Sequence, residues 1–197
     1  MFSHWAAGAN RHGYSVAVVG YRLCPEVRVA NIIEDAHNAA LLLHRSFGKR
    51  LVACGHSAGG HLVSTLVATN WQRSSASVPS DLVRKGISIS GVFDIAPLIE
   101  TEMNEQLRLD VEEAHAVSPI FWPVSADVRF EAWVGGDESS EFLRQSGIVV
   151  ERWGAAGATT RYVAIAGANH FTSPAGLADP ASPIVAALVA LAAATKA

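Results

Sequence analysis

Short β-type segments alternate with longer helical segments along this chain, and this alternation restricts the fold more than any other feature. Runs of β-branched and aromatic residues predict strands at residues 14–21, 50–54, 86–90, 128–134 and 161–166. Apolar residues at helical spacing predict helices near residues 29–45, 57–68, 104–107, 111–115 and 183–195, with another ending near residue 154. The chain is therefore predicted to be an α/β protein with a mostly parallel sheet and helices on both faces.

The composition is that of one globular domain and disfavours several other classes. The 197 residues suit a single domain over 1–197, and a half-hydrophobic chain with net charge −3 does not match a disordered one. The slightly acidic balance predicts no nucleic-acid partner. The apolar run at 184–194 is shorter than the roughly 20 residues of a spanning helix, so no membrane association is expected. Without a secretory signal, a cytoplasmic protein with reduced Cys24 and Cys54 is predicted.

The sequence GHSAGG at residues 55–60 lies between a predicted strand and a predicted helix. In this G-x-S-x-G arrangement the serine occupies a sharp strand-to-helix turn, and small neighbours allow the backbone to turn tightly. Ser57 is therefore the candidate nucleophile, and the N–H of Ala58 at the helix start can face a developing oxyanion. The flanking His56 and His61 are predicted to be structural, with His56 pointing away from the nucleophile.

Candidates for the acid and the base follow the last two predicted strands. In one known arrangement of serine hydrolases the nucleophile, acid and base follow in that order along the chain. His170 lies in the loop after the final strand and is the candidate base, while Asp137 and Glu138 follow the strand before it. Either carboxylate can accept the imidazole Nδ1–H and orient the ring. From their positions alone, both Glu138 and Asp137 stay open as the acid.

Motifs over nearly the whole chain resemble the α/β-hydrolase group that contains kynurenine formamidases (arylformamidases) and related bacterial esterases. The matching stretches are YRLCPE (21–26), GHSAGGHL (55–62), SGVFD (90–94), NEQLRLD (104–110), SP (118–119), EFLRQS (141–146) and NHF (169–171). The acid of this group lies four residues before the Phe of the Glu-Phe pair, which corresponds to Glu138. It also lies three residues after a strand-end Gly, here Gly135.

One departure from the group concerns the start of the domain. Its members carry an HGG-x-W type motif whose backbone N–H groups complete the oxyanion hole, whereas this sequence begins with residues that resemble the following helix. The resemblance thus implies an N-terminally truncated α/β-hydrolase fold. The group's third strand lies between those corresponding to 14–21 and 50–54, so its absence leaves a slot ~9–10 Å wide. The flanking strands then close up, another segment fills the slot, or both edges stay unpaired. A Cys24–Cys54 disulfide is not expected across this spacing.

These features predict an enzyme, a serine hydrolase that cleaves a small-molecule ester or an aryl formamide such as N-formylkynurenine. Ser57 forms the acyl-enzyme, His170 transfers the proton, and Glu138 or Asp137 orients His170. No metal or other cofactor is required. Four aromatic residues could line an apolar pocket for an aryl substrate or could equally belong to the core, namely Phe93, Phe121, Trp122 and Phe171. One alternative is a general carboxylesterase of the lipase-like type. Another is a catalytically weak or silent fragment, which would pair with itself as a homo-oligomer or with a missing N-terminal piece. Because loss of one oxyanion donor costs ~10²–10³ in rate, weak turnover is expected.

Overall fold

The sheet contains four parallel strands, and their order in space follows their order in the chain. The computed structural model describes residues 2–73 and 77–195. The strands are β1 (Leu51–His56), β2 (Val83–Ile89), β3 (Arg129–Gly135) and β4 (Thr159–Ile165). Each strand pairs in parallel with the next one, for example with Cys54 opposite Ile87 in the first pair. The predicted parallel α/β sheet is confirmed, together with the last four of the five predicted strands.

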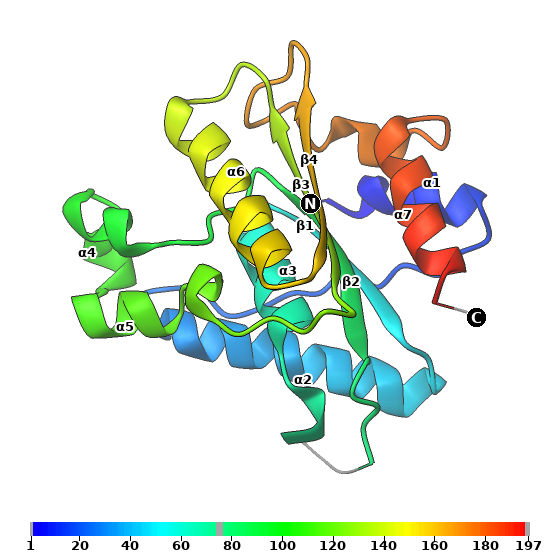
Figure 1. Cartoon of the computed structure of the whole chain (residues 1–197), viewed down its shortest axis with the longest axis horizontal. Coiled ribbons are helices and arrows are strands. Elements are labelled where there is room, and N and C mark those ends of the chain that lie inside the picture. Colours follow the sequence, from blue (N-terminus) through cyan, green and yellow to red (C-terminus); the bar gives the residue numbers. More distant parts are fainter. Residues whose placement is uncertain (1, 74–76, 196–197) are drawn as a thin grey trace.

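Helices cover both faces of this sheet (Figure 1). The α-helices are α1 (Ala7–Arg11), α2 (Val29–Phe47), α3 (Ala58–Ala68), α4 (Asn104–Leu107), α5 (Val111–Ala116), α6 (Ser140–Ala155) and α7 (Pro183–Ala193). Short 3-10 turns are η1 (Ser3–Ala6), η2 (Trp71–Arg73), η3 (Ala96–Glu100), η4 (Pro119–Phe121) and η5 (Ala175–Ala178). On one face α3 packs on β1 and β2, and α6 packs on β3 and β4. On the opposite face α7 contacts β1 and β2, with α1 beside it.

Local sequence explains where several of these helices begin and end. Gly48 adopts a left-handed conformation with φ of 63° and ends α2, a position where glycine has no Cβ penalty. The Asp110 carboxylate accepts the N–H of Glu113 and caps α5. Ser182 caps α7 in the same way, and Pro183 follows at the first helical position. The helical start that the sequence predicts corresponds to η1 and α1, and Met1 lies outside the described residues.

Apolar side chains fill both layers between the sheet and its helices. Phe130 on β3 and Trp153 on α6 are fully buried in the larger layer. On the other side of the sheet, Trp133 of β3 packs in a cluster with Ile184 and Val185 of α7. Because successive side chains of a strand point to opposite faces, one strand supplies both layers. This double burial is clearest in β3, where residues 132–135 are all buried.

The predicted strand at residues 14–21 is wrong. Within residues 2–73 and 77–195 this segment forms no strand and pairs with none, and residues 15–20 are exposed, including Val18 at 61%. β1 is the first strand in the sheet order and pairs only with β2 among the described residues. Of the three outcomes considered above for the missing strand, the third holds for the described part of the chain. There, neither the outer side of β1 nor the segment 14–21 pairs with another strand. The β-branched residues favour an extended backbone, but a strand also needs a neighbour to accept and donate its ladder hydrogen bonds.

Amide hydrogen exchange should reveal this unpaired segment directly. We expect the amides of residues 15–20 to exchange far faster than those of β2 and β3, which are central in the sheet. The physical reason is that, within residues 2–73 and 77–195, no backbone hydrogen bond protects those amides. Exchange followed by mass spectrometry on peptides that cover residues 15–20 and β2 measures the difference. Protection of residues 15–20 equal to that of β2 would contradict the unpaired arrangement.

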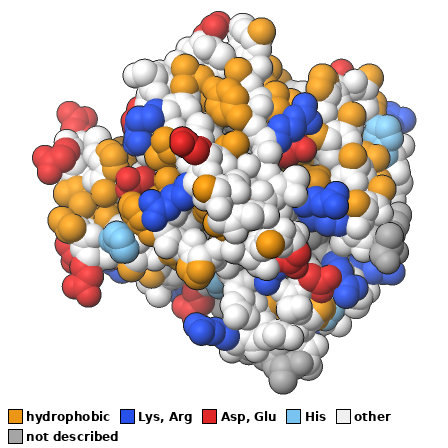
Figure 2. Space-filling model, in the orientation of Figure 1, with side chains coloured by type: hydrophobic (Ala, Val, Ile, Leu, Met, Phe, Trp, Pro, Cys, Tyr) orange, Lys and Arg blue, Asp and Glu red, His pale blue; other side chains and the backbone are white. Residues whose placement is uncertain are grey.

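The surface mixes charges of both signs. Figure 2 shows acidic side chains gathered around α4 and α5, while basic and acidic groups are interspersed over the rest of that face. None of the helices in the described part of the chain is long and apolar enough to span a bilayer. Cys24 and Cys54 are free thiols, as predicted.

Candidate active site

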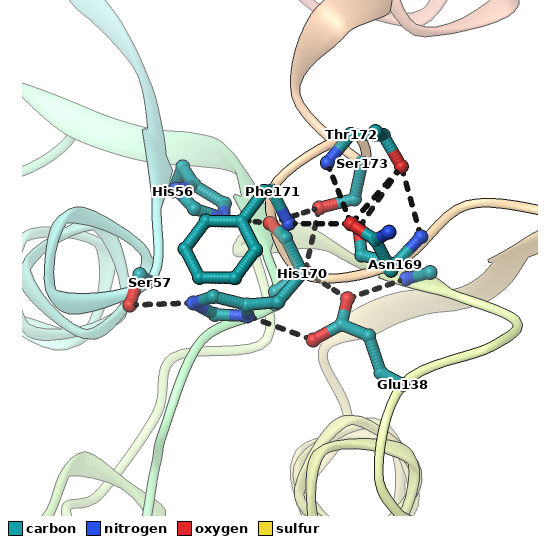
Figure 3. Close-up of polar contacts among 10 residues, drawn as sticks. His56, Ser57, Glu138, Asn169, His170, Phe171, Thr172 and Ser173 are labelled. Carbon is teal, nitrogen blue, oxygen red and sulfur yellow. Dashed lines mark hydrogen bonds and ion pairs between the residues drawn. The ribbon is translucent and has the colours of Figure 1, made fainter.

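Four loops that follow the strands meet at the carboxyl end of the sheet. Ser57 follows β1, Ser90 follows β2, Glu138 follows β3 and His170 follows β4. In a parallel sheet the carboxyl ends of all strands lie at the same end of the sheet, so residues distant in the sequence come together there. Ser57, His170 and Glu138 form a continuous hydrogen-bonded line, with His170 in the middle (Figure 3).

Ser57 occupies a strained turn between β1 and α3. Its φ is 56° and its ψ is −119°, a backbone conformation that L-residues seldom adopt. Small neighbours make the turn feasible, because a Cβ on Gly55 would lie 2.3 Å from the carbonyl oxygen of Gly59. The Ser57 N–H donates to the Ile89 carbonyl at 2.9 Å, which fixes the turn to the end of β2. The hydroxyl is thereby held at the sheet edge, as the G-x-S-x-G pattern predicts.

Ala58 is the first residue of α3, next to Ser57. The Ser57 carbonyl accepts the N–H groups of Gly60 and His61, whereas the Ala58 N–H has no backbone acceptor among the described residues. The first N–H groups of a helix carry partial positive charge and are free to bind an anion. The Ala58 N–H is therefore placed where it can donate to negative charge that develops beside Ser57 Oγ.

The loop that carries His170 is ordered by its own side chains. The Asn169 side-chain oxygen accepts the N–H groups of Phe171 and Thr172, and the Thr172 hydroxyl accepts the N–H of Asn169 (Figure 3). Such a turn, built by an Asn side chain on its own backbone, holds a loop without a regular element. It presents the imidazole of His170 between Ser57 and Glu138.

Glu138, rather than Asp137, is the carboxylate that contacts His170. The His170 Nδ1–H donates to Glu138 Oε2 at 2.8 Å, and the Glu138 side chain is 1% exposed. Asp137 is exposed, and its N–H donates to the Ala168 carbonyl. Gly135 is required at the strand end, because a Cβ there would lie 2.4 Å from the Ala168 oxygen. With no side chain at Gly135, its N–H can donate to Glu138 Oε1 at 2.8 Å.

The hydrogen bond to Glu138 selects the tautomer of His170. A carboxylate can only accept, so Nδ1 carries a proton, and in the neutral imidazole Nε2 then carries the lone pair. The Ser57 hydroxyl then donates to His170 Nε2 across 3.1 Å. In this state the imidazole can remove the Ser57 proton, and the buried carboxylate stabilises the imidazolium that results. The arrangement is chemically able to generate a serine nucleophile.

His56 lies closer to the site than the sequence predicts. Its Nε2–H donates to the His170 carbonyl at 2.7 Å, and the two imidazole rings are 4.7 Å apart (Figure 3). Burial lowers the pKa of His56, so its ring is neutral at pH 7. By contrast, His61 is buried on α3 and donates to the Val117 carbonyl at 2.8 Å, which fits the expected structural role.

The four aromatic residues proposed as pocket walls are not together. Phe93 is fully buried and packs against Phe130 in the core, so it does not line a substrate pocket. Phe121 stacks on His115. The side chain of Trp122 donates to the Ala116 carbonyl and contacts the cluster around α2 and α5.

Phe171 is the exception, since its ring lies 5.7 Å from that of His170 and is 86% exposed. Phe142, which was not predicted from the sequence, also lies close, with its ring 4.5 Å from that of His170. Its place in the motif EFLRQS, four residues after Glu138, is the signal that could have found it. These two rings give the site its apolar surroundings.

Two buried serines beside Glu138 were not predicted from the sequence. The Ser90 hydroxyl donates to Glu138 Oε1, and the Ser173 hydroxyl lies within hydrogen-bond distance of Ser90. Only the position of Ser90, at the end of a predicted strand and at the start of SGVFD, indicated a place near the site. Within the part of the chain that the structure describes, no three His, Cys, Asp or Glu side chains group as a metal site requires.

Comparison with known sequences places these residues in context. A sequence profile of the α/β hydrolase fold matches residues 4–173. Kynurenine formamidase of Danio rerio is 25% identical over 174 residues, and that of Salmo salar is 28% identical over 141 residues. The matches cover 85% and 68% of this chain but 58% and 47% of the two relatives. The chain thus spans about half the length of these formamidases.

Solved structures show the same architecture. A candidate thioesterase from Silicibacter sp. TM1040 is 35% identical, with a TM-score of 0.83 over 95% of this chain and 68% of that one. An esterase from Pyrobaculum calidifontis has a TM-score of 0.75 over 98% of this chain and 69% of that one. At 20% identity the second similarity concerns the fold alone.

Proposed function

Since the chain belongs to the α/β hydrolase fold family, we propose that it is a serine hydrolase that cleaves a carboxylic ester or an aryl formamide through an acyl-enzyme. The observation that carries this proposal is the line from Ser57 Oγ through His170 to Glu138, with distances of 3.1 and 2.8 Å. A nucleophile within hydrogen-bond reach of a base, itself oriented by a carboxylate, is the arrangement that activates a serine.

Acylation begins at Ser57. As Oγ attacks the substrate carbonyl carbon, its proton passes to His170 Nε2 and the carbonyl oxygen becomes an oxyanion. The Ala58 N–H donates to that oxyanion, and Glu138 stabilises the imidazolium. When the tetrahedral intermediate collapses, the bond to the leaving group breaks and His170 returns the proton to the departing alcohol or arylamine. The product of this half-reaction is an ester of Ser57.

Deacylation reverses the roles with water as the nucleophile. His170 Nε2 removes a proton from water, whose oxygen attacks the acyl carbon. Collapse of the second intermediate breaks the bond to Ser57 Oγ, and His170 gives the proton back to that oxygen. A carboxylic acid, or formic acid from a formamide, is released, and the starting state of Ser57 and His170 is restored.

The leaving group separates two substrate classes. An arylamine leaves only when it is protonated, so formamide cleavage depends on proton donation by His170. The sequence similarity to two kynurenine formamidases supports this class, as do the rings of Phe142 and Phe171 beside His170, which suit an aryl group. A general carboxylesterase is the second candidate, supported by the open setting of the site, where Phe171 is 86% exposed. The similarity to a candidate thioesterase adds a thioester as a third substrate to test.

A substrate panel on the purified chain tests the proposal. We expect N-formylkynurenine to be hydrolysed with kcat/KM about tenfold or more above that of p-nitrophenyl acetate and of an acetyl thioester. The reverse order would identify a general esterase or thioesterase, and turnover of none of the three would contradict the proposed function. Formate release and nitrophenolate absorbance are the measurements, and spontaneous hydrolysis without protein is the control.

A further inference from the structure

Glu138 is held by a second group besides His170, and this group is the buried serine that follows β2. The Ser90 side chain is fully buried, and its hydroxyl lies 2.5 Å from Glu138 Oε1. We propose that Ser90 is a positioning residue that fixes the Glu138 carboxylate so that Oε2 faces His170 Nδ1. This inference rests on the proposed function, because it assigns Ser90 a role in the same site.

The two oxygens of Glu138 are used for different purposes. Oε1 accepts the Ser90 hydroxyl and the Gly135 N–H at 2.8 Å, while Oε2 accepts the His170 Nδ1–H. Two donors on one oxygen prevent the carboxylate from rotating about its last bond. Because the side chain is only 1% exposed, water has little access to replace a lost donor. Ser90 therefore controls the direction in which the second oxygen points.

The backbone of Ser90 suggests that its side chain is kept for this contact. Ser90 has φ of 51°, in the left-handed region, where glycine would be unstrained. Its N–H donates to the Trp133 carbonyl at 2.7 Å, so the conformation is tied to the end of β3. A residue with a Cβ in this region is under strain, and such strain persists where the surrounding structure requires it. The contact that only the side chain makes is the one with Glu138 and its neighbour Ser173.

Ser173 links this contact to the loop that carries His170. Its hydroxyl lies 2.9 Å from Ser90 Oγ and 3.2 Å from the His170 carbonyl, and the residue is buried. Since the proton of Ser90 is directed to the carboxylate, the single proton of Ser173 is left to donate either to Ser90 Oγ or to the His170 carbonyl. The two serine hydroxyls thus lie between the Glu138 carboxylate and the His170 carbonyl. They connect the loops that follow β2, β3 and β4. Both partners of the Nδ1–H bond are positioned by the same small network.

A second buried serine, on the strand that Ser90 follows, provides a matched control. Ser88 lies two residues before Ser90, is also fully buried, and its hydroxyl has no hydrogen-bond partner among the described residues. Ser88→Ala and Ser90→Ala each remove one buried hydroxyl at the carboxyl end of β2, the first within the strand and the second directly after it. Only Ser90→Ala removes a donor to Glu138.

Kinetics of these variants test the proposal. We expect Ser90→Ala to lower kcat about 10- to 100-fold with little change in KM, the size typical of residues that orient a catalytic group. Ser88→Ala should keep both constants within about twofold of wild type. Ser90→Gly relieves the left-handed strain and should still lose activity, because it lacks the hydroxyl. Full kcat in Ser90→Ala, or recovery in Ser90→Gly, would overturn the proposal.

A spectroscopic measurement keeps this test independent of turnover. The Nδ1 proton of His170 gives a far-downfield NMR signal when it is held between imidazole and carboxylate. We expect this signal to shift or to broaden through faster exchange in Ser90→Ala, and to remain in Ser88→Ala. An unchanged signal in Ser90→Ala would contradict the positioning role even if the chain hydrolysed none of the substrates. Loss of the proposed function alone would leave the predicted change of this signal intact.

Discussion

Replacing Ser57 by alanine is expected to lower kcat for any cleaved substrate by roughly 10⁴- to 10⁶-fold, the largest effect of a single change in this chain. Without Oγ no acyl-enzyme forms, and His170 has no hydroxyl to deprotonate. KM should change little, because Ser57 acts in the transition state more than in substrate binding. Initial rates with the best substrate of the panel measure the loss.

Ser64→Ala is the matched control for this substitution. Ser64 lies on the same helix, α3, and its buried hydroxyl donates only to the His61 carbonyl. We expect this variant to keep kcat within a few-fold of wild type, since its hydroxyl does not reach the site. If Ser57→Ala retained wild-type turnover, Ser57 would not be the nucleophile.

Covalent labelling extends the test to conditions of slow turnover. An alkyl fluorophosphonate reacts with an activated serine by attack of Oγ on phosphorus and departure of fluoride. We expect mass spectrometry to find one phosphonyl group, on the peptide that contains Ser57, and none in Ser57→Ala. Labelling of Ser57→Ala to the same extent would show that another residue is the reactive one.

Replacing Glu138 by glutamine is expected to lower kcat by about 10³- to 10⁴-fold. A neutral amide does not stabilise the imidazolium, and its NH₂ group can stabilise the tautomer that leaves Nε2 protonated. Glutamine has nearly the same shape and can still occupy the buried space, so folding is expected to be retained. Steady-state kcat at neutral pH, together with a thermal melt of each variant, separates lost chemistry from lost structure.

Asp137→Asn is the control that decides between the two adjacent carboxylates. Asp137 is exposed and its side chain has no contact with His170, so this variant should stay within about threefold of wild type. Each substitution removes one negative charge from the same turn, which cancels general electrostatic effects. A larger loss in Asp137→Asn than in Glu138→Gln would make Asp137 the acid.

Predictions from the sequence succeeded where neighbours along the chain determine structure. The turn at Ser57 needs small residues within a few positions, and the short helices at 104–107 and 111–116 are set by local spacing and by the Asp110 cap. The segment at 14–21 failed for the opposite reason, because a strand depends on a partner that no local pattern reveals. The prediction that Phe93 lines a pocket was wrong for a similar reason, because an aromatic residue between strands has the same sequence pattern in a pocket as in a core.

The sequence by itself determined the α/β class, the order along the chain of the last four predicted strands and their helices, and Ser57 and His170 as the candidate nucleophile and base. Those properties follow from periodicity and from residue types placed directly after strands. Only the tertiary structure decided that Glu138 rather than Asp137 meets His170, and that His56, Phe142, Ser90 and Ser173 surround the site. Adjacent residues in a turn point in different directions, and contacts between loops of different strands depend on how the whole sheet brings its carboxyl ends together.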